Sequence, residues 1–313
     1  ASLLAILGGL VLTGAVTAVW ILKIPAELTG RPPMLTVMGG FALFFFVASI
    51  FAEKKILAKL AALEALGGIG NFPGSSAVSP PDEVLRQIPA LSAILPFLLL
   101  IMAAVRLPIL NPSPIFGLAL LLVVLLLGVA RVSAVDALAP VGLACVLALE
   151  HAWHFEHFSP KAATGPLLWY LLFGVVFLVF PFVCRQTIKA RVLPWAAAAL
   201  SLPLHFFLVY RLVDLAFPNG HMGLLPAAFS VPLLAGLYCL ARSVAASQPE
   251  RNALLAWFGG CALFFLTLIF PIQFERQWIT LGWALEGVAL LWLFHRVPHP
   301  GLAGAGVGLL AVA

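Results

Sequence analysis

The sequence has few charged residues. Asp, Glu, Lys and Arg make up 9% of its 313 residues, and 63% of the residues are hydrophobic. Soluble domains carry about 25% charged residues. The mean hydropathy of +1.12 is therefore too high for a globular core to hide the apolar surface, and it indicates that most of the chain is surrounded by lipid.

Several signals of binding or catalysis are also missing. The four cysteines are dispersed without a CxxC spacing, so no structural zinc site or redox pair is indicated. The stretch "GGIGNFPG" is not followed by Gly-Lys-Ser/Thr, and no Gly-x-Ser-x-Gly elbow occurs. Most of the basic residues stand singly between apolar runs, and no basic stripe with interleaved aromatic residues occurs, which argues against a nucleic-acid partner. The sequence predicts no cofactor and favours a function without catalysis.

Long apolar runs dominate what remains. A bilayer core of about 30 Å takes roughly 20 helical residues, and continuous runs without ten-residue alternation favour helices over a transmembrane barrel. We predict an all-α polytopic helix bundle of 10–11 spans, with residues 1–313 as one transmembrane domain. The spans are expected near 3–22, 34–52, 88–105, 114–131, 136–153, 166–184, 192–213, 222–244, 253–273, 277–295 and 300–313.

Both ends of the sequence lie within apolar runs. It starts with "ASLLAILGG", without a Met or a signal-peptide pattern, and stops within "GVGLLAVA". We expect it to be part of a longer polypeptide.

The distribution of basic residues predicts an orientation. Eleven of the 17 Lys and Arg residues fall on the side that contains loop 53–87, and six fall on the other side. The positive-inside rule then places this loop and the segment before residue 3 in the cytoplasm. We expect a bacterial inner membrane, with membrane lipids and bound lipid as the surroundings and other membrane subunits as further partners.

Loop 53–87 is the only long loop between the predicted spans. It opens with "EKKILAKLAALEAL", in which aliphatic residues recur at helical spacing. This pattern favours a short amphipathic helix on the membrane surface. A helix packed against other loops of the protein fits the pattern equally well.

A short motif occurs twice. "GGFALFF" at 39–45 and "GGCALFF" at 259–265 differ at one position. Duplicated helical units would explain the repeat, and such units are common among transporters. Chance similarity between apolar segments is the other explanation.

Glu286 is the most conspicuous candidate residue, because it stands inside the apolar stretch "TLGWALEGVALLWLF". A charge that faced lipid at this depth would cost at least about 3 kcal/mol. Gly282 and Ala289 share its helical face and allow another helix to approach. We therefore expect Glu286 to point into the bundle, beside Trp283. It then serves as a proton relay, substrate contact or ion site, or it simply links two helices.

The stretch "EHAWHFEHF" is a second candidate. His151, His154 and His157 are spaced by three residues, and Glu150 precedes His154 by four. Imidazoles one helical turn apart can share a metal ion. However, His151 and His157 lie roughly 120° apart around a helix. Histidines and aromatic residues are also common at the membrane interface without a ligand.

The span 192–213 contains a third set of polar residues. His205 lies within the bilayer region, whereas Arg211 and Asp214 lie near its outer surface. Arg211 and Asp214 are three residues apart and are placed to form an interfacial ion pair. His205 and Glu286 fall at comparable depths, so contact between them is an open alternative.

The stretch from about 165 to 302 resembles the bacterial multi-pass membrane proteins of the domain of unknown function 2339 family. The resemblance is carried by "LLWYLLFGVVFLVFP", "AAALSLPLHFFLVY" and above all "FPIQFERQWITLGWALEGVALLWLFHR". It implies an array of many membrane helices. It also places Trp283, Glu286 and Gly287 in the most recognisable motif, but it implies no mechanism.

Three functions fit these observations. A structural or accessory subunit of a membrane assembly is expected first, because no dense polar site is visible. A transporter or flippase that uses buried Glu286 is the alternative. A membrane-embedded transferase acting on lipid-linked substrates ranks last, because Glu27 is the only acidic residue in an outer loop near the first spans. A pocket lined by Glu286 and open on one side would favour transport over the subunit function.

Overall fold

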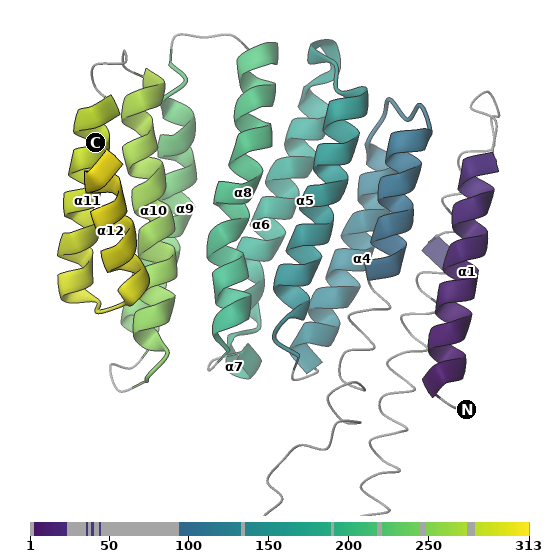
Figure 1. Ribbon diagram of the computed structural model, residues 1–313, viewed down its shortest axis with the longest axis horizontal. Coiled ribbons are helices and arrows are strands. Elements are labelled where there is room, and N and C mark those ends of the chain that lie inside the picture. Colours follow the sequence, from purple (N-terminus) through teal and green to yellow (C-terminus); the bar gives the residue numbers. More distant parts are fainter. Residues whose placement is uncertain are drawn as a thin grey trace, which may run out of the picture. The chain divides into compact units, whose positions relative to one another are not determined.

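The computed structural model describes residues 3–23, 94–132, 135–188, 191–217, 221–244, 248–273 and 279–312, with isolated positions between 36 and 44. Every regular element within these ranges is a helix (Figure 1). The chain divides into two compact units, Ala1–Phe158 and Ser159–Ala313.

Unit 1 contains four described helices: α1 (Leu3–Lys23), a helix over Ile94–Arg106, α4 (Ser113–Val132) and α5 (Leu138–His157). The end of α5 is tied to the connection before α4. The Trp153 Nε1–H donates to Ile109 O at 2.8 Å, and its ring meets Phe116 edge to face at 5.7 Å. Buried indole N–H groups need such a partner, so this bond fixes α5 against the connection.

Unit 2 holds the remaining helices: η1 (Pro160–Ala162), α6 (Thr164–Val183), α7 (Arg185–Ile188), α8 (Val192–Ala216), α9 (Leu224–Ser243), α10 (Arg251–Gln273), α11 (Ile279–Arg296) and α12 (Pro300–Val312). Helix α10 packs against α8, α9 and α11, and α11 packs against α12 (Figure 1). The Phe206 ring on α8 contacts Phe229 of α9 at 5.4 Å and Phe265 of α10 at 5.1 Å. These edge-to-face contacts join three helices in one buried cluster.

The helices follow the hydropathy of the sequence. Among the described residues, six helices are long and apolar enough to cross a membrane: α4, α5, α6, α8, α9 and α10. The predicted all-helical membrane fold is thus confirmed. Each predicted span coincides with a described helix, except for 34–52. Apart from isolated positions, that span lies outside the described residues, and so does loop 53–87 with the amphipathic helix predicted there. The total of 10–11 spans and the single domain stay predictions.

Candidate functional site: a pocket between α10, α11 and α12

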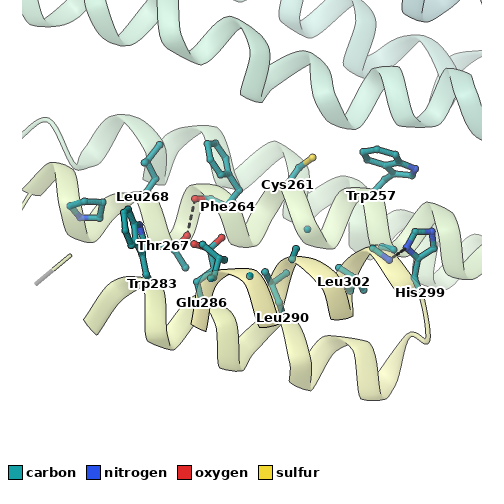
Figure 2. Close-up of a pocket in the computed structure, with 17 residues that line it drawn as sticks. Trp257, Cys261, Phe264, Thr267, Leu268, Trp283, Glu286, Leu290, His299 and Leu302 are labelled. Atoms are coloured by element: carbon teal, nitrogen blue, oxygen red, sulfur yellow. Dashed lines mark hydrogen bonds between the residues drawn. The ribbon is translucent and has the colours of Figure 1, made fainter. Parts of the chain in front are cut away.

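A cavity of about 820 Å³ lies between α10, α11 and α12 (Figure 2). Small-molecule sites typically measure about 300–1,000 Å³. The α10 residues that line the cavity include a series that recurs every three or four positions, namely Trp257, Cys261, Phe264, Leu268 and Pro271. One face of a single helix therefore borders the cavity over about 21 Å, at about 1.5 Å of rise per residue.

Small residues on α12 leave the space for this cavity. Gly301, Ala305 and Gly308 all line it, and their i, i+4, i+7 spacing places them on one helical face. A Cβ atom built on Gly308 would meet no heavy atom within 4 Å. The pocket thus depends on the small size of these three residues, beside Leu302 and Leu309 of α12, which also line it.

Other glycines bring α11 and α12 into close contact. A Cβ atom on Gly287 would lie 2.6 Å from Leu310 Cγ and 2.9 Å from Gly306 O. A Cβ atom on Gly306 would lie 3.0 Å from Gly287 O. Close backbone approach through glycine is typical of packed membrane helices, and it holds α12 beside the helix that carries Glu286.

Glu286 lines the pocket near the middle of α11, and 8% of its surface is exposed. Its side chain lies beside that of Thr267 on α10 in Figure 2, within reach of a hydrogen bond. Thr267 Oγ1 is also 3.0 Å from both Leu263 O and Phe264 O. A hydroxyl group has one proton to donate. When that proton goes to a backbone carbonyl, Thr267 can only accept from a protonated Glu286. When it goes to Glu286, the carboxyl can be ionised.

The remaining polar groups of the pocket are sparse. Of the residues within the described ranges, the ionisable ones that line it are Glu286, His299 and Cys261, and none is a Lys or Arg. His299 Nδ1 accepts from the backbone N–H of Gly301 at 3.2 Å, so the proton of the neutral ring lies on Nε2. His299 and Trp257 lie at one end of the pocket, and Trp283 lies with Glu286 toward the other (Figure 2).

The structure brings together some of the residues predicted from the sequence and separates others. Trp283 and Glu286 line the same pocket. His205 is 1% exposed on α8, with Nδ1 2.6 Å from Ser201 O. A Cβ atom on Gly174 of α6 would lie 3.8 Å from His205 Nδ1. His205 therefore lies at the contact between α6 and α8, whereas the polar neighbour of Glu286 comes from α10.

Arg211 and Asp214 lie on the last two turns of α8. Both side chains are exposed, and no ion pair joins them in the described structure. They do not line the pocket around Glu286. The ion pair expected between Arg211 and Asp214 therefore stays a prediction.

The histidines of "EHAWHFEHF" make separate contacts. His151 Nδ1 lies 2.7 Å from Leu147 O, and His157 Nε2 lies 2.6 Å from Ala104 O. The His154 ring stacks on Phe158 at 4.5 Å. Across the ranges that the structure describes, no group of three or more His, Cys, Asp or Glu side chains is placed to hold a metal ion. The metal site stays a prediction without a matching cluster.

Three polar or ionisable residues of the pocket were not identified as site candidates from the sequence, namely Thr267, His299 and Cys261. Thr267 is the only hydroxyl residue within Arg251–Gln273, and His299 stands between two prolines in "VPHPG". The small residues of α12 at helical spacing were a further signal, because they mark a helix face without bulk.

The long apolar helices and the buried Glu286 define an all-helical polytopic membrane protein, with lipid in contact with its exposed apolar side chains. Residues 102–313 match the family described as "Predicted membrane protein (DUF2339)". The match covers more than half of the sequence, and the chain belongs to this family. The matched region begins at residue 102, well before residue 165, where the motifs quoted from the sequence begin. No curated protein and no solved structure matches the chain.

Proposed function

We propose that this chain is a membrane transporter for amphiphilic small molecules, which bind in the pocket between α10, α11 and α12. The observation that carries the proposal is a cavity of about 820 Å³ that is mostly apolar and lined by Glu286. A bundle with a purely structural carboxyl group would close around it. Here the carboxyl borders a space large enough for a ligand.

The exposure of the lining residues supports entry from the lipid. Phe264 on α10 is 41% exposed, and Ala305 and Gly308 on α12 are exposed as well. The pocket therefore opens beside α12. An amphiphilic molecule dissolved in the bilayer can reach such an opening without crossing water.

The proposal also includes the membrane, the orientation and the partners of this transporter. The positive-inside pattern supports an orientation with loop 53–87 and the connection between α11 and α12 on the cytoplasmic side. We expect the membrane to be a bacterial inner membrane. The transporter would need no cofactor. Other membrane subunits would be partners in a larger assembly.

A neutral probe tests the pocket independently of charge. The full chain in proteoliposomes is labelled with a photoactivatable long-chain alcohol, with and without excess unlabelled alcohol, and the labelled peptides are mapped. We expect saturable labelling of α10 and α12. Gly308→Leu should reduce it several-fold, because the side chain enters open space in the pocket. Gly304→Leu is the matched control, because a Cβ atom there also meets nothing within 4 Å but does not line the pocket.

Transport of a nonionic single-chain amphiphile, with a head group too polar to cross a protein-free bilayer quickly, provides the second measurement. Saturable transport that Gly308→Leu slows and Gly304→Leu preserves would support the transporter. Labelling that cannot be competed away, or equal behaviour of the two variants, would overturn it and favour the structural or accessory subunit.

A further inference from the structure

The charges around the pocket select the kind of ligand. Among the residues that the structure describes, Glu286 is the only carboxyl group that lines the cavity, and no described Lys or Arg lines it. Within an apolar cavity, charge–charge interactions are far stronger than in water. An ionised Glu286 would therefore attract a cation and repel a phosphate or carboxylate group.

The aromatic lining favours the same ligands. Trp283 precedes Glu286 by three residues, so the two side chains lie on adjacent turns of α11, and both border the cavity (Figure 2). Trp257 and Phe264 line it from α10. The faces of indole and phenyl rings attract organic cations. A carboxyl group with aromatic neighbours in an apolar cavity thus matches a cation that carries a large apolar body.

The cavity volume limits the size of this body. At roughly 30 Å³ for each water-sized group, about 820 Å³ accommodates about 27 non-hydrogen atoms. A two-chain phospholipid is about twice as large by the same measure. A single lipophilic cation of about 25 non-hydrogen atoms fits, such as tetraphenylphosphonium.

From these observations we infer that the pocket binds one lipophilic organic cation and that Glu286 releases a proton when the cation binds. The inference rests on the proposed pocket function and adds the charge of the ligand and the ion exchanged for it. A neutral carboxyl group and a monovalent cation become an ion pair and a free proton, so the charge of the pocket does not change. The Thr267 hydroxyl serves both states, because it can accept from the protonated carboxyl and donate to the ionised one.

Few other groups near Glu286 can contribute to a dependence on pH. Helix α10 presents Thr267 and Cys261 to the cavity, and α12 has no ionisable side chain over Pro300–Val312. His299, in the connection between α11 and α12, is the other group that can gain a proton there. Its positive form would also disfavour a cation, so the test needs a variant at this position.

Two ions of equal size and opposite charge test the inference. Tetraphenylphosphonium and tetraphenylborate compete with the photoactivatable alcohol for the full chain in proteoliposomes. We expect the cation to displace the alcohol at a concentration at least about tenfold lower than the anion. Glu286→Gln should abolish this preference while the neutral alcohol still labels the pocket. Asp214→Asn, an exposed acid outside the pocket, is the matched control and should retain the preference.

The dependence on pH provides the readout for proton exchange. Acidification should weaken displacement by the cation in the wild type and in His299→Gln, but not in Glu286→Gln. If Glu286→Gln does not fold, Trp283→Leu replaces it, and the cation should lose its advantage several-fold while the alcohol still binds.

The two proposals fail in different ways. Equal displacement by both ions in the wild type, or a preference that survives Glu286→Gln, would overturn the cation inference and leave the pocket function standing. A dependence on pH that disappears in His299→Gln would overturn the role of Glu286 in proton exchange. Failure of the neutral alcohol to label the pocket would overturn the proposed function itself.

Discussion

Replacing Gly287 with alanine tests the close packing of α11 against α12. The added Cβ atom would lie 2.6 Å from Leu310 Cγ and 2.9 Å from Gly306 O. The leucine side chain can rotate away from this contact. The backbone oxygen can move only if one helix shifts against the other.

Opposing effects determine the size of the change. Glycine to alanine in a helix stabilises it by up to about 1 kcal/mol, whereas overpacking at a tight contact costs about 1–3 kcal/mol. Because a backbone atom is involved, we expect Gly287→Ala to lower the free energy of unfolding by about 1–2 kcal/mol. Gly304→Ala on α12 meets no atom within 4 Å, so it should raise that free energy by up to about 1 kcal/mol.

The two variants should therefore change stability in opposite directions. Unfolding of the purified chain in mixed detergent micelles, followed by circular dichroism over a range of SDS concentrations, measures both. If Gly287→Ala stabilised the protein as much as Gly304→Ala, the close contact between α11 and α12 would be refuted.

Three further predictions follow from individual contacts and from the charge pattern. Glu286→Gln should change the free energy of unfolding by under about 1 kcal/mol, and Glu286→Leu by more; equal thermal stability of the purified variants would contradict a structural hydrogen bond. Trp153→Phe should destabilise the chain by about 1–3 kcal/mol, because it leaves the buried Ile109 carbonyl without its donor; detergent unfolding measures the loss, and an unchanged midpoint would argue against the bond. In a background without the four native cysteines, an impermeant thiol reagent should label intact cells at Ser159→Cys but not at Ser76→Cys; the reverse result would invert the topology.

The long helices could be predicted from the sequence because each of them is a continuous apolar run of about the length of the bilayer. The run at 192–213, for example, became Val192–Ala216. Glu286 could also be singled out, since one carboxyl group among apolar residues is conspicuous and expensive to expose.

The neighbours of Glu286 could not be predicted in the same way. In a membrane helix both the lipid-facing and the buried sides are apolar, so hydropathy does not reveal how each helix is rotated about its axis. Similar depth made His205 a possible neighbour, yet it lies beside α6, and Thr267 of α10 lies beside Glu286. Depth along a span thus says little about which spans are adjacent.

The stripe of small residues on α12 has a consequence for the effect of single substitutions. The cavity exists where Gly301, Ala305 and Gly308 lack bulk, while the packing of α11 on α12 depends on Gly287 and Gly306. The volume of the cavity and the packing of the two helices therefore depend on different residues, with Gly301, Ala305 and Gly308 on α12 bordering the cavity and Gly287 of α11 and Gly306 of α12 at the helix contact. A single substitution in the stripe can therefore change the volume of the cavity and leave the contact between α11 and α12 intact.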